Sequence, residues 1–230
     1  MKKVAILQSN YIPWKGYFDM IRSVDEFILY DDMQYTRRDW RNRNLIKSPH
    51  GLHWLTIPVE VKGKYDQKIK DTKISDKSWA KDHWKTIKLF YSKSAHFKEY
   101  ENLFEKTFFE CESIEFLSQV NFKWINLICD LLQIPTKLSW SMDYELKDGK
   151  TERLIGLCQS VGATHYLSGP AAKDYIVNQL FEDADISLEY MNYAGYPEYP
   201  QLYGGFEPGV TILDLFFNVG PESLNYIKRL

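Results

Sequence analysis

The stretch "KKVAILQSNYIPWKGYFDMIRSVDEFILYDD", residues 2–32, determines the fold that we expect. Its ends, "KKVAILQS" and "DEFILYDD", are typical of short buried strands, and between them Phe18, Ile21 and Val24 recur at helical spacing. A strand, a helix and a second strand indicate parallel pairing through a right-handed crossover. Because ligands of open parallel sheets bind beyond the carboxyl ends of the strands, the residues that follow each strand are the first candidates for a site.

The rest of the chain continues this pattern around a helical middle segment, about residues 77–134, which Pro135 ends. We expect further strands at "LHWLTIPVEV", "QKIKDTKI", "THYLSG" and "ISLEYMNY". We expect helices at "TERLIGLCQSVGA", "PAAKDYI", "VTILDLFFNVG" and "PESLNYIKRL", and an ordered loop at "AGYPEYPQLYGGFEPG". The sequence therefore predicts a single α/β domain over residues 1–230 with a mainly parallel, Rossmann-like sheet.

The overall charge favours neither nucleic acid nor an anionic membrane as a partner. The 230 residues include 29 Lys and Arg and 31 Asp and Glu, a formal net charge of −2. An anion site would therefore be local. Aromatic residues make up 16% of the chain, which suits ring-shaped polar ligands as well as a core and is compatible with a homodimer.

The cysteines and histidines predict neither a disulfide framework nor a metal site. Three widely spaced cysteines form no CxxC motif, and five histidines form no HxxxH, HxH or Cys-His pair. The first apolar run, "VAIL", is too short for a signal peptide, and no run approaches the ~18 apolar residues of a membrane span. We expect a cytoplasmic protein without a membrane-spanning segment.

The turn after the first strand combines amides with aromatic rings. It carries Gln8, Tyr11, Trp14 and Tyr17, with Pro13 and Gly16 shaping the entry into the helix. A helix N-terminus beside a glycine suits a phosphate or carboxylate. The alternative is that the rings only cap the sheet edge.

The second strand is followed by an acidic and then a basic group of residues in "YDDMQYTRRDWRNRN". Arginine forks match phosphate oxygens, and nearby carboxylates bind hydroxyl or amine groups, so this segment is a candidate substrate site. A salt-bridged surface loop is the alternative, and a short nucleic-acid patch is a third possibility. The candidate residues are Asp31, Asp32, Gln34, Tyr35, Trp40, Arg41 and Arg43.

Two further positions are candidates for chemistry. His83, in "KDHWKTI", is a possible general base if a pocket surrounds it, although a lone histidine is more often structural. In "YLSGPAAKDY" a strand ends at Ser168 and Gly169, and Lys173 follows in the first turn of the next helix. That connection is a second candidate anion site at the sheet edge, or simply a strand-to-helix turn.

Six blocks of the chain follow one another in this order: "ILQSNYIPWKGYFDMI", "DDMQYTRRDWRNRN", "WLTIPV", "HWKTI", "GATHYLSGPAAKDY" and "YPQLYGGFEPGVTILDLFFN". Together they resemble the WbqC-like family, whose members are often encoded among genes for O-antigen and other surface polysaccharides. The resemblance implies a role in making or decorating an amino sugar, by transfer of an acyl or aminoacyl group such as glycyl. It brings no catalytic assignment. The positions that it carries over are Gln8, Tyr11, Pro13, Trp14, Gly16, Tyr17, Asp31, Gln34, Tyr35, Trp40, Asn42, Arg43, His83, Lys85, Ser168, Gly169, Lys173, Gln201 and Asp214.

The opening is also similar, more loosely, to that of nucleotidyltransferase-like enzymes, some of which adenylate a carboxylate before an amine attacks it. This similarity implies a nucleotidyltransferase-like fold and ATP as cofactor; the residues themselves identify no cofactor. The opening turn of those enzymes carries two histidines, whereas "YIPWKGY" has none. Tyr11 and Lys15 are the candidates to replace them.

The leading hypothesis is an acyl or aminoacyl transfer to the amine of a nucleotide-linked sugar. Aromatic rings would stack on the base and sugar, Arg41 or Arg43 would hold phosphate, and Asp31, Asp32 or His83 would accept the amine proton. This predicts that Arg43→Ala and Asp31→Asn abolish turnover with little change in melting temperature. The alternatives are a non-catalytic module that binds a nucleotide-linked sugar or a partner protein, and a nucleic-acid-binding protein acting through "RRDWRNRN".

Overall fold

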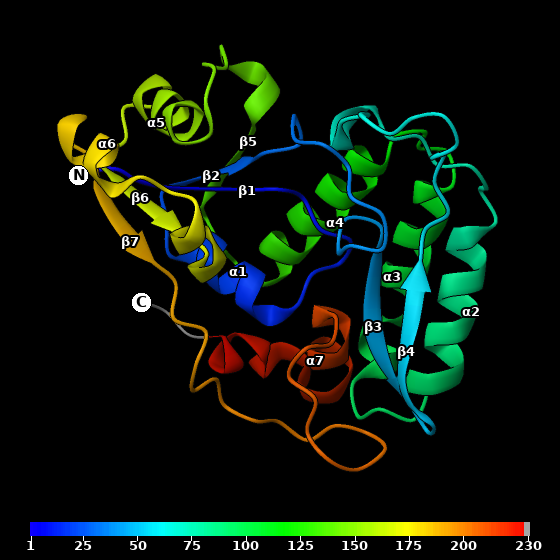
Figure 1. Ribbon diagram of the computed structural model, residues 1–230. Helices are drawn as coiled ribbons and strands as arrows, with labels where there is room; N and C mark the ends of the chain where they lie inside the picture. The colour runs from blue at the N-terminus through cyan, green and yellow to red at the C-terminus, as the bar shows by residue number, and fades with distance from the viewer. Residues whose placement is uncertain (228–230) are drawn as a thin grey trace.

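Five parallel strands form the central sheet of the protein, in the computed structural model that describes residues 1–227 (Figure 1). Their order across the sheet is β5-β2-β1-β6-β7. The strands span Lys3–Leu7 (β1), Glu26–Leu29 (β2), Lys137–Trp140 (β5), His165–Ser168 (β6) and Ser187–Tyr190 (β7). Each neighbouring pair is parallel, which confirms the predicted α/β class and sheet type.

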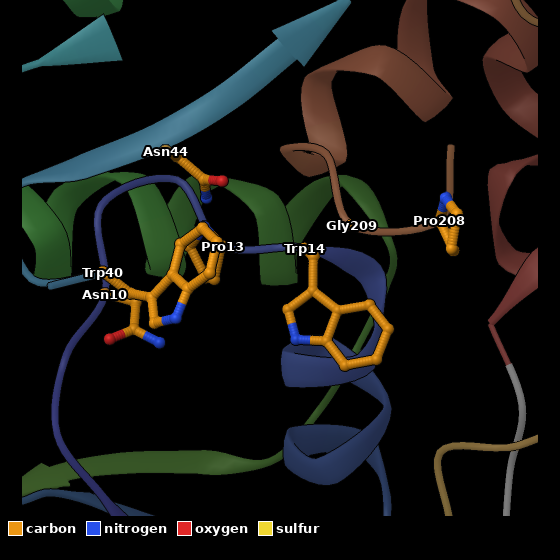
Figure 2. A pocket seen from close by; sticks show the side chains of 7 residues that line it. All are labelled: Asn10, Pro13, Trp14, Trp40, Asn44, Pro208 and Gly209. Atoms are coloured by element: carbon orange, nitrogen blue, oxygen red, sulfur yellow. The ribbon is translucent and has the colours of Figure 1, made fainter. Parts of the chain in front are cut away.

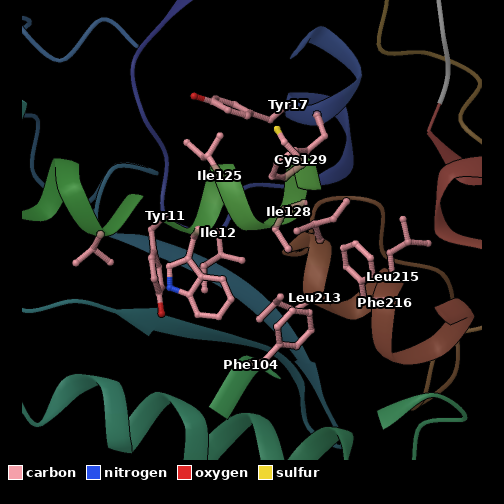
Figure 3. Close-up of a cluster of buried hydrophobic side chains, with 14 of the residues drawn as sticks. Tyr11, Ile12, Tyr17, Phe104, Ile125, Ile128, Cys129, Leu213, Leu215 and Phe216 are labelled. Atoms are coloured by element: carbon pink, nitrogen blue, oxygen red, sulfur yellow. The ribbon is translucent and has the colours of Figure 1, made fainter. Parts of the chain in front are cut away.

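Alternating side chains of the strands build a hydrophobic cluster on each face of the sheet. Ala5 and Phe27 belong to a large cluster shared with α1 (Lys15–Arg22), α4 (Leu117–Leu131) and α7 (Ile212–Val219); Figure 3 shows part of it. Val4 and Ile28 belong to a second cluster shared with α5 (Lys150–Ser160) and α6 (Asn178–Asp183). In Figure 1, α5 and α6 accordingly lie on the opposite side of the sheet from α1.

The predicted helical middle segment consists of α2 (Trp79–Tyr91), α3 (Phe97–Cys111) and α4. A hairpin of β3 (Arg43–Ser48) and β4 (Gly51–Thr56) lies beside α2 (Figure 1). The expected strand "LHWLTIPVEV" is therefore real over Gly51–Thr56, but it pairs antiparallel with β3 and not with the central sheet. Its tight turn ends at Gly51, whose φ of 103° suits glycine.

Several local expectations differ from the structure. "QKIKDTKI" forms a 3₁₀ turn at Ile69–Asp71, because the backbone N–H groups of Ile69 and Lys70 bond to the carbonyls of Met33 and Asp31 and not to a strand. "PAAKDYI" is a 3₁₀ turn at Pro170–Asp174. "PESLNYIKRL" is 3₁₀ over Gly220–Tyr226, and its residues 228–230 lie outside the described part of the chain. Strands β3 and β5, helix α6 and a 3₁₀ turn at Ser141–Asp143 are additional.

The predicted Gly/Pro/Tyr-rich loop, residues 194–209, lies within a segment without helix or strand, residues 191–211. Two buried lysines anchor it: Lys15 Nζ donates to the Pro197 carbonyl at 2.8 Å, and Lys47 Nζ to the Gly204 carbonyl at 2.7 Å. At its end, the Thr211 hydroxyl donates to the Ile12 carbonyl at 2.7 Å. These bonds fix the loop against the turn that follows β1.

Candidate functional site

A cavity of about 250 Å³ opens at the carboxyl ends of β1 and β6. The chain proceeds from β1 to β2 and β5 on one side, and from β6 to β7 on the other, so this point is the topological switch of the sheet. Gln8 follows β1, Arg41 comes from the segment before β3, and Ser168 and Gly169 end β6. Residues from three predicted candidate segments, the turn after β1, the charged segment after β2 and the connection after β6, therefore meet in one hollow. We call this hollow the switch-point cavity.

Arg41 is the most firmly held cation of this cavity. Its guanidinium donates to the side-chain oxygen of Asn10, and at 3.4 Å to Oε1 of Gln8, while Asp39 lies 3.5 Å away. Its own carbonyl accepts from Asn121 Nδ2 at 2.9 Å. A guanidinium has five N–H donors, so donors remain for a ligand after these contacts.

Lys150 is a second cation at the wall, and the sequence reasoning missed it. It is the first residue of α5, directly after Gly149, whose φ is 88°. The available signal was a lysine directly before a predicted helix, at the sheet edge where the other candidates lie. Of the described residues that line the cavity, none is Asp or Glu. Its electrostatics therefore favour an anion.

Three tyrosines complete the wall: Tyr30, Tyr166 and Tyr175. Burial raises the pKa of all three phenols, so they carry their protons at neutral pH and can donate hydrogen bonds. The Ser168 hydroxyl donates to the Tyr166 oxygen at 3.3 Å and is buried with it. The cavity thus combines two cations with neutral hydroxyl groups, a lining suited to phosphate and sugar oxygens.

The turn after β1, residues 8–14, is held rigidly. Ile12 has a φ of 38°, a costly conformation for a β-branched residue. Asn44 Nδ2 bonds to the carbonyls of Tyr11 and Ile12, at 3.0 and 2.8 Å, and the backbone N–H of Tyr11 donates to the Trp40 carbonyl at 2.9 Å. The surrounding structure thus fixes a strained turn at the site.

Asp31 does not line the cavity. It is fully buried and accepts from the backbone N–H and hydroxyl of Ser9, at 2.8 and 2.7 Å, and from the hydroxyl of Ser118. Burial raises the pKa of this carboxyl, and the three hydrogen bonds offset part of that effect. Asp31 therefore positions Ser9, between Gln8 and Asn10. Its replacement is expected to lower stability, contrary to the sequence-based expectation for Asp31→Asn.

Asp32 is also saturated by protein groups. It accepts from Ser141 Oγ at 2.8 Å and pairs with Lys70 at 2.6 Å and Lys68 at 3.5 Å. Burial acts to raise the pKa of Asp32, but the bonds from Lys70 and Ser141 outweigh it and the pKa is lowered. This carboxylate holds the 3₁₀ turn at Ile69–Asp71 against the end of β2.

His83 belongs to α2, and its side chain is buried between this helix and the hairpin. Nε2 is 3.2 Å from the Thr56 carbonyl, which can only accept, so Nε2 carries the proton and Nδ1 accepts from the Tyr11 hydroxyl at 2.8 Å. Burial lowers the pKa of His83 to about 4. The imidazole is neutral, and both nitrogens are occupied.

The remaining predicted residues divide between packing and surface positions. Tyr17 and Tyr35 are buried, and the Tyr17 hydroxyl donates to the Gln8 carbonyl at 3.0 Å. Gln34 bonds to the Tyr65 carbonyl, and Lys173 lies over the Tyr190 ring. None of these side chains lines the switch-point cavity.

Trp14 and Trp40 line a separate cavity, of about 270 Å³ (Figure 2). Arg43 lies outside both cavities, with its guanidinium 4.0 Å from the centre of the Trp54 ring. The predicted group is thus split: Gln8, Arg41, Ser168 and Gly169 surround one hollow, and the two tryptophans another.

The proposed substitutes for nucleotidyltransferase histidines do not reach the cavity either. Tyr11 is fully buried against His83, and Lys15 is enclosed by Tyr196, Tyr199 and Phe206. Burial lowers the pKa of Lys15 to about 8, against the attraction of Asp214 and Glu198. These positions do not fit phosphates of ATP at the opening turn.

Within residues 1–227, no helix is both long enough and apolar enough to span a bilayer.

Comparison with known proteins gives a family and one relative of high identity. An uncharacterized protein of Mycobacterium tuberculosis, Rv1507c, is 54% identical over 228 residues, which cover 99% of this chain and 98% of that protein. No solved structure matches. The model of the WbqC-like protein family matches residues 8–226, a range that contains every segment lining the two cavities except the end of β1. The chain therefore belongs to the WbqC-like protein family.

Proposed function

We propose that the protein is a transferase of surface-polysaccharide biosynthesis that acylates or aminoacylates the amine of a nucleotide-linked sugar. The observation that carries this proposal is the cavity at the switch point of the sheet, where Arg41 and Lys150 face a hollow lined by hydroxyl groups. This is the position at which open parallel sheets bind their ligands. The cations match a diphosphate, and the tyrosine and serine hydroxyls match a sugar.

Arg41 is the residue that binds phosphate in this scheme. Asn10 and Gln8 fix its guanidinium before a ligand arrives, so little side-chain entropy is lost on binding. Lys150 adds a second charge from the start of α5, where free backbone N–H groups also favour an anion. The pair would anchor the diphosphate and leave the sugar facing the tyrosines.

The reaction joins the sugar amine to an activated acyl donor, for which a thioester is the simplest class. The amine nitrogen attacks the thioester carbonyl, the C–N bond forms, and the C–S bond breaks with its electrons on sulfur. The nitrogen loses one proton, and the leaving thiolate gains one. Asp31, Asp32 and His83 are each engaged with protein groups, so the chain's contribution in this scheme is to bind and orient the amine.

Binding and turnover can be tested separately. Calorimetry with inorganic pyrophosphate measures the anion site, and Arg41→Ala is expected to weaken binding about tenfold. Lys173→Ala is the matched control, since this cation belongs to the turn after β6 but lies over Tyr190 and not in the cavity. Equal losses in both variants, or no binding to the native protein, would refute the anion site.

For turnover, nucleotide-linked amino sugars are incubated with acetyl-coenzyme A, or with glycine and ATP, and mass spectrometry detects the mass added to the sugar. Product that depends on Arg41 supports the transferase. Tight, Arg41-dependent binding of an amino sugar without product in any mixture would instead identify a binding module. The saturation of all three candidate bases by protein groups favours that second function.

A further inference from the structure

The cavity between Trp14 and Trp40, the tryptophan cavity, is the second hollow next to the turn after β1. Its volume is about 270 Å³, and Asn10, Pro13, Asn44, Pro208 and Gly209 complete its lining. Figure 2 shows the two indole rings separated across this space, with Asn10 below Trp40 and Pro208 beyond Trp14. Of the described residues that line it, none is charged. It therefore favours an uncharged ligand.

Trp14 is held in place by its neighbours. A Cβ atom at position 16 would lie 2.3 Å from the Trp14 ring, so the indole folds over α1 only because residue 16 is glycine. The rings of Tyr193 and Tyr196 pack edge-on against it, with centroids at 5.2 and 5.8 Å. The indole is thus a fixed wall and not a mobile surface group.

Trp40 is supported on one side and open on the other. The centres of the Trp40 and Trp54 rings are 5.5 Å apart, and the guanidinium of Arg43 stacks over the Trp54 ring, 4.0 Å from its centre. Even so, Trp40 is 42% exposed, which is unusual for so large an apolar residue. A flat ring bound in the tryptophan cavity would cover that surface.

The polar groups that the lining side chains leave for a ligand are hydrogen-bond donors. Because a guanidinium only donates, its bond with Asn10 fixes the amide oxygen toward Arg41 and leaves the Asn10 NH₂ group for other partners. No hydrogen bond within residues 1–227 uses that NH₂ group, or the indole N–H of Trp14 or Trp40. The NH₂ group of Asn44 donates to the backbone carbonyls of Tyr11 and Ile12. The matching ligand is planar, uncharged and rich in acceptors.

The two cavities share a wall. Asn10 lines the tryptophan cavity, Arg41 lines the switch-point cavity, and the two side chains are hydrogen-bonded to each other. Each cavity alone is smaller than the roughly 300–1,000 Å³ that hold a drug-sized ligand, whereas the two together fall within that range. An elongated ligand with a charged and a neutral part fits this arrangement.

We propose that the tryptophan cavity binds the nucleobase of the nucleotide whose phosphates occupy the switch-point cavity. This inference rests on the proposed function, because it takes the anion at Arg41 to be a nucleoside diphosphate. The base stacks against Trp40 and accepts hydrogen bonds from Asn10 and the indole N–H groups. A single-ring base with two carbonyl oxygens, such as uracil, matches a lining of donors best.

The test compares uridine diphosphate with inorganic pyrophosphate by calorimetry. Trp40→Ala is expected to weaken uridine diphosphate binding about tenfold and to leave pyrophosphate binding within about twofold. Gly16→Ala, which displaces the Trp14 ring without removing it, is expected to act in the same direction. Tyr65→Ala, an exposed aromatic that lines neither cavity, is the control and changes neither affinity. Melting temperatures verify that each variant is folded.

Two results would overturn the inference: uridine diphosphate binding no tighter than pyrophosphate, or an affinity for uridine diphosphate that Trp40→Ala leaves unchanged. A hexose 1-phosphate serves as a further ligand. If Trp40→Ala weakens the binding of this ligand and not that of uridine diphosphate, the cavity binds a sugar and the nucleobase assignment is wrong. The proposed function fails separately, when pyrophosphate binding is absent or independent of Arg41. If pyrophosphate binding depends on Arg41 but Trp40→Ala leaves the affinity for uridine diphosphate unchanged, the anion site is supported and the nucleobase site is refuted.

Discussion

The ends of β1, β2 and β6 lie at the same edge of the sheet, but the carboxylates that follow β2 are enclosed by protein groups, whereas a cavity opens beyond β1 and β6. Beyond β2, Asp31 and Asp32 meet Ser118 of α4, Ser141 and Lys70. Beyond β1 and β6, the following helices pack on opposite faces of the sheet. Because these connections diverge, space remains between the ends of β1 and β6. Near β2 the neighbouring elements converge, and they supply hydrogen-bond and ion-pair partners for Asp31 and Asp32.

This difference separates structural from ligand-binding polar groups. Asp31 and Arg41 were equal candidates by residue type, since both follow β2 in a loop rich in charge. The first is saturated by three hydrogen bonds in a dry interior, and the second keeps free donors toward a cavity. A polar residue at a strand end is thus a site candidate only where the packing leaves it unsatisfied.

The largest effect is expected from Asp31→Ala. Three donors on Ser9 and Ser118 would lose their acceptor in the interior, which we expect to lower the free energy of unfolding by about 4 kcal/mol. Urea denaturation measures the loss. Ser118→Ala, which removes one of these donors, should cost markedly less. A stable Asp31→Ala variant without phosphate affinity would mean that the end of β2 belongs to the ligand site after all.

A pH effect of nearly the same size is expected from His83. Its pKa of about 4 in the folded protein lies below the ordinary histidine pKa of 6.5, so between these pH values the unfolded chain binds a proton that the native state does not. The free energy of unfolding should therefore fall by about 3 kcal/mol as the pH drops from 6.5 to 4.

His83→Gln isolates this contribution. Carboxylates such as Glu26 also titrate in acid: burial acts to raise the pKa of Glu26, but hydrogen bonds from Lys2, Ser139, Lys137 and Tyr144 outweigh it and lower the pKa to about 2. The difference between wild type and variant, measured by urea denaturation across the pH series, cancels these groups. Equal slopes in both proteins would show that His83 is protonated in the native state and open to proton exchange.

Arg41→Ala should have a small effect on stability and a large one on ligands. Its hydrogen bonds go to Asn10 and Gln8 at the cavity wall, so we expect a loss of about 1 kcal/mol or less, measured by thermal denaturation. Its phosphate affinity should nevertheless fall as described above. Global unfolding of this variant would contradict the contrast with Asp31.

The smallest effect is expected from Lys173→Ala. Its ammonium lies 5.0 Å from the centre of the Tyr190 ring at the surface, and such a contact contributes about 0.5 kcal/mol. Thermal denaturation and pyrophosphate binding should both stay close to wild type. Weaker pyrophosphate binding would extend the anion site to the turn after β6.

The part of the fold that follows from local patterns was predictable. Alternation and helical spacing identified β1, α1, β2, the middle helices, β6 and β7. Strand β5 (Lys137–Trp140) was not predicted, because four residues shortly after a proline carry little periodicity. The β3–β4 hairpin was not predicted either, although "KSPHGL" marks a turn between two apolar runs. Residues 67–74 alternate like a strand, but the backbone of Gln67, Ile69 and Lys70 bonds to the loop after β2.

The meeting of three segments at the site was predictable from parallel topology, whereas the roles within it were not. Whether a carboxylate is free depends on partners far along the chain: Ser118 for Asp31, Lys70 for Asp32, and Tyr11 for His83. Lys150 has no local distinction beyond its place at a helix start. Spacing predicts which elements adjoin, but saturation of polar groups is decided by tertiary packing.

The sheet order also has a consequence during synthesis on the ribosome. Strand β1 occupies the middle of the sheet, but one of its two partners begins at His165. Until translation has passed β6, one edge of the first strand has no native neighbour, and unpaired strand edges invite association with other chains. The arrangement that creates the hollow thus leaves the nascent protein dependent on residues far along the chain, and its binding site is completed only after β6 has been synthesised.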